Sequence, residues 1–421
     1  MTGQTLAQKI LARASGQSEV NPGDIVTCEV DLAMFHDSSG PRRLQPMLDS
    51  LGATVWDTDR IVLVIDHYLS APDRESQQIV QIAREWADKM KLKNFYDSQG
   101  ICHVVLPERG HLRPGMFCVG GDSHSPTGGA FGTYMFGIGA TEMLGVVVTG
   151  EIWVRVPRTI RYQFDGQLDR GVSAKDLMLT LIGRYGMDGG QYQAVEFAGS
   201  TVSAMDMPER MTLSNMAAEL GAQAGLVQAD ETTRQYLLKA GVPDCAIDLS
   251  AGQGDAGADV ELHRFDATLI EPQIALPHSP ANSVAASQCE PSPVDIAYLG
   301  ACTGAKLVDM QAAAAVLRGK KIASSVAFLL APASVRDQEA ARVDGSLQIL
   351  IDAGAHLLPS ACGACAGYGS RISEGARVIS STARNFQGRM GAASAQVWLG
   401  SPYTVAASAV RGRLTDPREL L

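Results

Sequence analysis

Short apolar runs that end at polar or glycine-rich segments recur along this chain. The run at 60–69, RIVLVIDHYL, delivers Asp66 and His67 at its end, and a run that begins at residue 116 leads into a glycine-rich loop and then a helical pattern. Continuous apolar runs of this length are typical of buried strands. Helical patterns such as 173–186 and 306–319 alternate with them. The alternation predicts an α/β fold, in which functional sites collect where strand ends meet such loops.

The length of the chain predicts more than one domain. A chain of 421 residues is too long for one ordinary hydrophobic core, so two or three domains are expected. The segment 270–295 is rich in proline, serine and alanine and has weak periodicity, which is typical of a crossing between domains. We therefore expect one part of the molecule over 1–285 and a further α/β domain over 286–421.

The charge and the apolar runs limit the partners. The net charge is −10 and no basic stripe is visible, so nucleic acid is not expected as a partner. The longest apolar runs, such as 143–150, are much shorter than a membrane span. The amphipathic pattern at 1–15 is not followed by the apolar core of a signal peptide. These features predict a cytoplasmic protein with no membrane partner.

Three of the eight cysteines form a pattern that suggests chemistry. Cys362 and Cys365 are separated by two residues after an apolar run, and Cys302 follows a short apolar strand in a glycine-containing turn. All three lie at strand-to-loop junctions of one domain, where they could converge. The other five, Cys28, Cys102, Cys118, Cys245 and Cys289, are expected to be buried thiols.

The cysteine pattern alone leaves several interpretations open. A zinc site, an iron–sulfur cluster and plain buried or redox-active thiols all use such spacing. A structural zinc site normally needs four Cys or His ligands, and no fourth cysteine accompanies these three. A 4Fe–4S cluster held by three thiolates would leave one iron without a protein ligand. That iron could act as a Lewis acid on a substrate hydroxyl and carboxylate.

Seven motifs together resemble the aconitase superfamily over nearly the whole chain, in particular the large subunits of the isopropylmalate dehydratase and homoaconitase branch. They are IDHYL, GICHVVLPE, GGDSHSPTGGAFGTYMFGIGATE, EFAGSTVSAMDMPERMTLSNMAAELGAQAGLVQADETT, GACTGAK, SACGACAG and RNFQGRMG, in the order in which the family has them. The resemblance implies three α/β domains around a central cleft, two of them intertwined over 1–285 and the third over 286–421. The family's mobile fourth (swivel) domain has no room before Leu421, so a separate small subunit that carries it is expected.

The resemblance also implies the site residues. The ligands of a 4Fe–4S cluster with one iron that lacks a protein ligand would be Cys302, Cys362 and Cys365. The acid–base residues would be Asp66, His67, His103, Asp122, His124 and Glu219. The substrate-binding residues would be Asn215, Arg384 and Arg389. His36 is expected near the site.

The chemistry of these residue types agrees with a hydro-lyase that acts on a small hydroxy di- or tricarboxylate. A histidine held by a carboxylate can move a proton near neutral pH, and arginine binds carboxylates with two hydrogen bonds. Asn215 and Glu219 are four apart on a predicted helix over 211–227, so they should share one face. The default substrate is 3-isopropylmalate, with dimethylmalate, citramalate or homocitrate-type acids as alternatives. A non-catalytic RNA-binding relative is the alternative of another class.

The chain departs from the family pattern at three places. Isopropylmalate enzymes often carry another residue pair between the later cysteines than Gly363-Ala364. The family commonly has Asn after the Cys-Thr of the first cluster cysteine, where this chain has Gly304. We expect a side-chain hydrogen bond near the cluster to be lost there. After the Asp-Ser-His motif the chain reads Ser125-Pro126-Thr127, where Thr is normally abundant. These departures bear on the substrate and leave the three cysteines intact.

Overall fold

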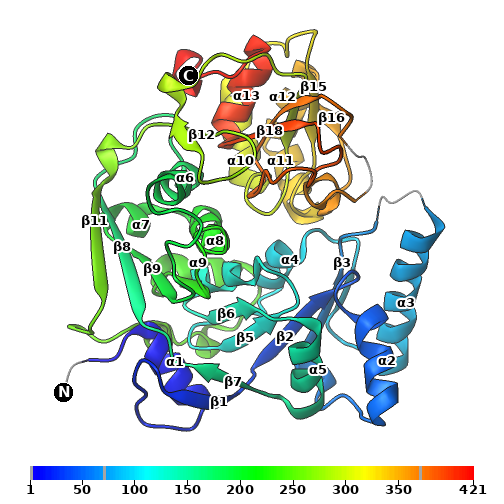
Figure 1. Cartoon of the computed structure of the whole chain (residues 1–421), viewed down its shortest axis with the longest axis vertical. Coiled ribbons are helices and arrows are strands. Elements are labelled where there is room, and N and C mark those ends of the chain that lie inside the picture. The colour runs from blue at the N-terminus through cyan, green and yellow to red at the C-terminus, as the bar shows by residue number, and fades with distance from the viewer. Residues whose placement is uncertain (1–2, 70–72, 369–371) are drawn as a thin grey trace.

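The computed structural model describes residues 3–69, 73–368 and 372–421. Within them the chain forms three parallel or mostly parallel sheets and one two-stranded ribbon, each accompanied by helices. Figure 1 shows the seven-stranded C-terminal sheet at one end of the molecule, and the N-terminal five-stranded sheet at the other. The predicted α/β class is confirmed.

The N-terminal sheet has five parallel strands in the order β4-β3-β2-β5-β6. Their bounds are β2 Leu32–His36, β3 Ile61–Ile65, β4 Phe95–Asp97, β5 Phe117–Gly120 and β6 Tyr134–Gly137. Every residue of β2, β3 and β5 is buried, as the continuous apolar runs predict. Because β3, β2 and β5 are parallel neighbours, the polar residues that follow them meet at one edge.

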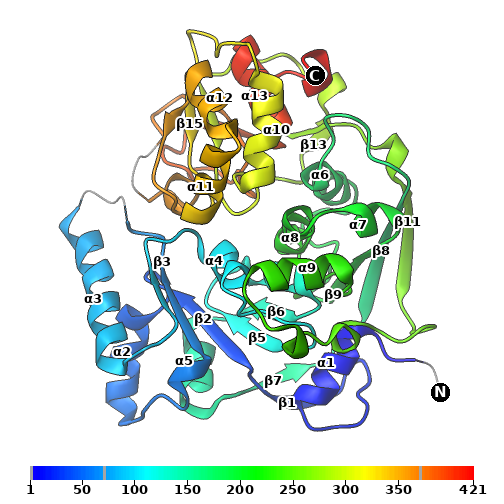
Figure 2. The same ribbon diagram turned by 180° about the vertical axis from the view of Figure 1, so that it is seen from behind.

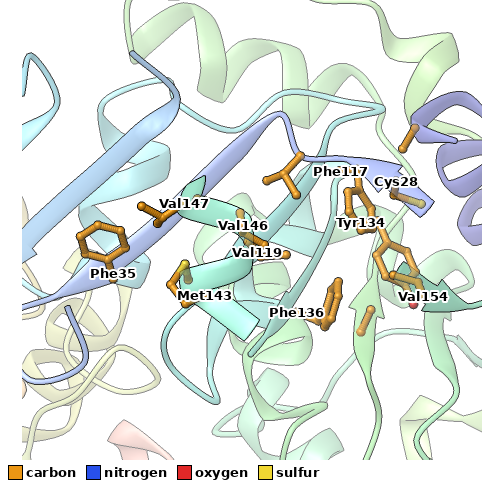
Figure 3. Packing of buried hydrophobic residues seen from close by; sticks show 14 of the residues in the cluster. Cys28, Phe35, Phe117, Val119, Tyr134, Phe136, Met143, Val146, Val147 and Val154 are labelled. Atoms are coloured by element: carbon orange, nitrogen blue, oxygen red, sulfur yellow. The ribbon is translucent and has the colours of Figure 1, made fainter. Parts of the chain in front are cut away.

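Helices pack against this sheet and close its core. Their bounds are α2 Pro41–Leu51, α3 Arg74–Met90, α4 Cys102–Glu108 and α5 Ala140–Thr149. Figure 3 shows Met143, Val146 and Val147 of α5 against Phe35 and Val119 of the sheet. The apolar run 100–108 forms helix α4, so His103 lies on a helix that contacts β3.

The two-stranded antiparallel ribbon consists of β1 (Ile25–Glu29) and β7 (Glu151–Arg155). Burial alternates along β1, with Val26 and Cys28 inside, which is the pattern of a strand with one solvent face. Helix α1 (Leu6–Ala14) packs against it and begins at a capping box made by Thr5 and Gln8.

A second parallel sheet has the order β10-β9-β8-β11. Its strands are β8 Thr159–Asp165, β9 Ala194–Ala198, β10 Ala224–Leu226 and β11 Glu261–Asp266, and its helices are α6 Ala174–Tyr185, α7 Ser200–Ala204, α8 Met207–Met216 and α9 Glu231–Lys239. Figures 1 and 2 show α8 between α6 and the N-terminal sheet. No described helix is long and apolar enough to cross a bilayer.

The helix that carries Asn215 begins and ends earlier than the sequence predicts. Asp206 caps α8 through its side chain, and the helix ends at Met216. The predicted helix over 211–227 is therefore wrong at both ends, because Asp206 followed by Met-Pro at the first helical positions is the stronger start signal. Glu219 lies in the turn after the helix.

The third sheet has seven strands in the order β13-β12-β18-β17-β14-β15-β16. Their bounds are β12 Gln273–Ala275, β13 Ser283–Ala285, β14 Ile296–Leu299, β15 Ala327–Leu330, β16 His356–Leu357, β17 Arg377–Ser380 and β18 Gln396–Gly400. Its helices are α10 Leu307–Leu317, α11 Val335–Val343, α12 Ser346–Ala353 and α13 Pro402–Arg411. Strands β12 and β13 lie inside 270–295, so this segment is part of the sheet, and its role as a crossing between domains stays a prediction. Strands of three residues leave too little periodicity to detect.

Candidate active site

A cavity of about 330 Å³ lies where the N-terminal sheet faces the C-terminal unit. Nine of the twelve predicted site residues line it: His67, His103, Asp122, His124, Cys302, Cys362, Cys365, Arg384 and Arg389. Each of the other three bonds a lining residue: Asp66 bonds His67, Glu219 bonds His124 and Asn215 bonds Cys302. The structure thus brings together residues that are up to 323 positions apart, from Asp66 to Arg389.

The pair Asp66–His67 follows β3 and is buried. Asp66 Oδ1 lies 2.6 Å from His67 Nδ1, and Asp66 Oδ2 accepts a hydrogen bond of 2.7 Å from the Cys102 backbone N–H. Burial alone would lower the pKa of His67, but the charge of Asp66 and its hydrogen bond raise it to about 10. Since Nδ1 is engaged by Asp66, Nε2 is the nitrogen left for a ligand in the cavity.

Two further histidines are each held by a carboxylate. His103 Nε2 lies 2.7 Å from Asp122 Oδ1, and His124 Nε2 lies 2.9 Å from Glu219 Oε1. Burial would raise the pKa of Asp122, but the charge of His103 and hydrogen bonds lower it well below its usual range. Three imidazole–carboxylate pairs therefore surround one cavity.

Glu219 also orients an arginine. Its Oε1 accepts from Arg384 Nε, and Arg384 Nη1 donates to Ser123 Oγ over 2.9 Å. Burial would raise the pKa of Glu219, but His124 and Arg384 lower it to about 2. Although Glu219 lies past the end of α8, the turn still directs it to the cavity, so the predicted convergence with Asn215 occurs by a different geometry.

Asn215 connects the glycine-rich loop with the first cysteine. Its Nδ2 donates to Thr127 Oγ1 over 2.8 Å and to Cys302 Sγ over 3.1 Å. Hydrogen bonds to a cysteine sulfur are among the ways a protein adjusts a thiolate that ligates iron. Asn215 therefore touches a sulfur atom of the site.

The sulfur side of the cavity is tied to the histidine side through the backbone. The Cys362 N–H donates to the Asp66 carbonyl over 2.9 Å, and the Cys365 N–H donates to the Cys362 carbonyl over 3.0 Å. The Cys362 thiol lowers the pKa of Cys365 by hydrogen bonding; burial opposes this shift, and the charge of Arg389 reinforces it. Burial raises the pKa of Cys302 to about 12, so its thiolate would need a metal.

The donor set fits an iron–sulfur cluster with three protein ligands. Three thiols line the cavity, and no other cysteine among the described residues does. The Nε of Arg389 is buried without a hydrogen-bond partner among the described residues, and the guanidinium interacts electrostatically with Cys365 and Cys362. Sulfur donors with a nearby cation are the environment that Fe–S clusters use.

Gly304 has a structural explanation that the sequence does not reveal. A Cβ at this position would overlap the Ser381 side chain and lie 2.6 Å from the Ser381 carbonyl oxygen. Ser381 Oγ accepts from the Gly300 N–H over 2.9 Å and donates toward the Gly304 carbonyl over 3.2 Å. The expected loss of a hydrogen bond in this turn is thus offset, because a serine from another loop occupies the space and bonds the turn.

Ten described lining residues were not among the predicted catalytic, substrate-binding or metal-ligating residues, and three of them have large polar side chains: His36, Arg43 and Tyr368. His36 stacks on His67 with ring centroids 3.8 Å apart, and both its ring nitrogens are buried without a hydrogen-bond partner in the described structure. Its position at the end of a buried strand was the available signal. Arg43 and Tyr368 also line the cavity, but they lie outside strand ends and no pattern distinguishes them.

Comparisons with known proteins show which family the chain resembles over its length. Residues 8–412 match the model of the Aconitase family (aconitate hydratase). The chain is 41% identical to the 3-isopropylmalate dehydratase large subunit 1 of Methanopyrus kandleri over all of both chains. It is 40% identical to the chloroplastic 3-isopropylmalate dehydratase large subunit of Arabidopsis thaliana, covering all of this chain and 87% of that protein.

A solved structure supports the fold. The crystal structure of Thermococcus kodakaraensis aconitase X (holo-form) matches with a TM-score of 0.51 and 12% sequence identity, covering 90% of this chain and 89% of that chain. The likeness concerns the fold alone. With the full-length matches and the grouping of cysteines, histidines and arginines in one cavity, it leads to one conclusion: the chain belongs to the aconitase family.

Proposed function

We propose that this chain is the catalytic large subunit of a hydro-lyase that removes and returns water on a small hydroxy di- or tricarboxylate similar to 3-isopropylmalate. The observation that carries the proposal is the meeting of three thiols, three imidazole–carboxylate pairs and two arginines around one cavity. Relatives that match over full length are named 3-isopropylmalate dehydratase large subunits.

Cys302, Cys362 and Cys365 would hold a 4Fe–4S cluster. When bound, the cluster supplies a Lewis acid, through the iron without a protein ligand, for a hydroxyl and a carboxylate. The hydrogen bond from Asn215 to Cys302 and the charge of Arg389 would stabilise the thiolates. No other metal ligand is required from this chain.

The histidines would manage the protons. His67 presents Nε2 to the cavity while Asp66 holds Nδ1, so it can protonate the departing hydroxyl group and later take the proton back. Two further pairs would form hydrogen bonds with the substrate hydroxyl and carboxylate: His103 with Asp122, and His124 with Glu219. Arg384, fixed by Glu219 and Ser123, and Arg389 would bind carboxylates.

A small subunit with the swivel domain would complete the site. The relatives are named large subunits, which implies a companion chain. Abstraction of the proton from carbon requires a base on the opposite face of the substrate, and we expect the companion to bring that base, a serine, and a further carboxylate-binding arginine.

The default substrate is 3-isopropylmalate, and one observation favours a second candidate. Arg43 lines the cavity and has no carboxylate partner among the described residues. A guanidinium there would suit a third carboxylate, as in a homocitrate-type acid, better than an isopropyl group. Dimethylmalate and citramalate are the smaller dicarboxylate alternatives.

The test is a substrate panel under anaerobic conditions. The chain is purified together with its companion subunit, and formation of the unsaturated product is followed by absorbance for each acid. Preferential dehydration of 3-isopropylmalate supports the default, preference for a tricarboxylate supports the second candidate, and preference for dimethylmalate or citramalate supports the smaller alternatives. Arg43→Leu should then reduce only tricarboxylate turnover, whereas Arg42→Leu, its neighbour outside the cavity lining, should not. Failure with every acid despite an intact cluster would contradict the proposal.

Two rival interpretations have direct tests. Metal analysis after anaerobic reconstitution separates a cluster, with iron and sulfide at about four each, from a zinc site with about one zinc. An RNA-binding role predicts affinity of the cluster-free chain for RNA that falls steeply with salt.

A further inference from the structure

Lys175 is a buried lysine in the first turn of α6 and does not line the cavity. Only 1% of it is exposed. Its Nζ donates to the Ser381 carbonyl over 2.7 Å, to the Thr382 carbonyl over 2.8 Å and, more weakly, toward Thr303 Oγ1 over 3.5 Å. These contacts lead to both sides of the site, because Thr303 follows Cys302 and the 381–382 segment leads to Arg384.

No carboxylate lies within ion-pair distance of Lys175 among the described residues. The contrast is Lys306, another buried lysine next to Cys302, which lies 2.9 Å from Asp309. Three carboxylates act on Lys175 at longer range. Those of Asp309 and Glu219 are already paired with Lys306 and Arg384, and that of Asp176 accepts hydrogen bonds from Ser173 and from the Gln273 N–H. Lys175 is therefore a buried cation with no carboxylate in direct contact.

This arrangement is costly unless an anion is close. Removing an ammonium from water carries a desolvation penalty that a buried ion pair offsets only when its geometry is good. The first turn of a helix adds to the cost, because the partial positive charge of the helix N-terminus disfavours a cation. Burial lowers the pKa of Lys175 to about 8, which still leaves it charged at neutral pH. Packing alone would be served by an uncharged side chain.

The missing anion lies on the cavity side. Thiolates of Cys302, Cys362 and Cys365 around a cluster carry net negative charge, and the Lys175 ammonium reaches the turn that holds the first of them. We propose that Lys175 is a positioning residue that supplies buried positive charge to the cluster and holds the Cys302 turn against the Arg384 segment. This inference rests on the proposed function, since it needs the cluster.

A buried cation beside a cluster has two measurable consequences. It stabilises the more negative, reduced state, so it raises the midpoint potential. It also strengthens the binding of the thiolate-held cluster, as residues around metal ligands do, by about 10–100-fold in affinity. Neither effect requires Lys175 to touch the substrate.

The experiment compares three substitutions in the anaerobically reconstituted full chain. Lys175→Met and Lys175→Gln remove the charge, and Gln keeps a hydrogen-bond donor; Lys175→Arg keeps the charge. Ser381→Ala is the matched control, because it loses the Oγ bonds to the Cys302 turn but keeps the carbonyl that Lys175 uses. The readouts are the midpoint potential by EPR-monitored titration and the rate of iron loss to a chelator.

We expect Met and Gln to shift the potential to more negative values and to release iron about 10-fold faster or more, while Arg stays close to the unsubstituted chain. Folded Met and Gln variants that assemble no cluster, beside an Arg variant that does, give the same support. A Gln variant with unchanged potential, a Ser381→Ala shift as large as that of Gln, or an Arg variant that fails with the others would overturn the inference. An unsubstituted chain that takes up zinc and no sulfide would instead overturn the proposed function, and this inference with it.

Discussion

The two walls of the cavity differ in how completely their polar groups are paired within the chain. On the histidine wall, built by the N-terminal sheet, α4 and the turn after α8, the imidazoles of His67, His103 and His124 each bond a carboxylate of the protein, and His36 is the imidazole there without such a bond among the described residues. On the sulfur wall, no described carboxylate pairs with the three thiols, and their side-chain contacts are with one another, with Asn215 and with Arg389. There Arg389 Nε is buried without a partner, and Lys175 lacks a carboxylate in the described structure.

This difference indicates which polar groups of the site have their partners in the folded chain and which would gain a partner only from a bound cofactor or substrate. Paired imidazoles and carboxylates keep their geometry without a ligand, because each partner compensates the burial of the other. Cations next to thiols are compensated when the thiols ionise or when another anionic group binds. Under the proposed function, the histidine wall would transfer protons, and the sulfur wall would hold a cluster and a carboxylate.

The largest effect is expected from removing one thiol, which tests whether the sulfur wall can be disabled without the histidine wall. Cys365→Ser should abolish cluster assembly and with it turnover, while the histidine wall and the fold persist. Iron and sulfide analysis after anaerobic reconstitution measures this, and circular dichroism checks the fold. Cys245→Ser, at an exposed cysteine outside the cavity, is the control and should behave as the unsubstituted chain. Full dehydratase activity in Cys365→Ser would show that the ligand assignment is wrong.

A substitution on the histidine wall should reduce turnover without loss of the cluster. His67→Ala removes the proton donor and should reduce turnover by about 10²–10⁴-fold, while iron and sulfide stay at the level of the unsubstituted enzyme. Steady-state kinetics of the complex with the small subunit, together with metal analysis, separates the two effects. His356→Ala changes an exposed histidine on β16 and serves as control. Near-normal turnover in His67→Ala would show that His67 packs in the site but does not transfer a proton.

The sequence predicts the positions on the two walls unequally. Asp66, His67 and Asp122 follow strands of continuous apolar residues, so their convergence at one sheet edge follows from parallel strand order. His103 does not follow this rule, because its apolar run forms helix α4. A short run without alternation fits a buried strand or a buried helix equally well.

Contacts between segments that are distant in the sequence could not be predicted from the sequence. The resemblance gave Cys302, Cys362 and Cys365 together, but nothing local indicates that Ser381 fills the space next to Gly304 or that Lys175 reaches the same turn. Arg43 is similar, since it sits in the first turn of α2 without a strand-end signal. Such partners are fixed by how the sheets pack, and no periodicity encodes that.

The support of the sulfur wall can be tested at Gly304. Gly304→Ala places a Cβ against the Ser381 side chain and carbonyl, and overpacking of this kind costs about 1–3 kcal/mol. We expect a lower unfolding midpoint and faster iron loss. Ser381→Gly in the same chain should recover part of the stability, because the carbonyl contact at 2.6 Å remains. Thermal denaturation of the single and double variants measures this. An unchanged midpoint in Gly304→Ala would show that the turn has room to move.

The smallest predicted effect concerns Glu108, which connects the two sides of the molecule away from the cavity. This buried glutamate of α4 accepts a hydrogen bond of 2.6 Å from Ser334 Oγ. Ser334 is the residue that caps the N-terminus of α11. Burial and the charge of Asp337 raise the pKa of Glu108 to about 7. A raised carboxyl pKa contributes stability that is fully present below the unfolded value of about 4.3 and is lost as the pH rises through about 7.

Glu108→Gln, a neutral isostere, should therefore melt at a higher temperature than the unsubstituted chain at pH 8.5 and at nearly the same temperature at pH 4. The difference in melting temperature should open between about pH 4.3, where a glutamate of the unfolded chain ionises, and about pH 7, where Glu108 ionises in the folded chain, and should stay constant above that. Glu85→Gln, at an exposed glutamate of α3, controls for the change in net charge and should give parallel curves. Parallel curves for Glu108→Gln as well would mean that Glu108 is already ionised in the folded chain. The Glu108 carboxylate would then contact α11 in its ionised form, as the carboxylates of the histidine wall contact their imidazoles.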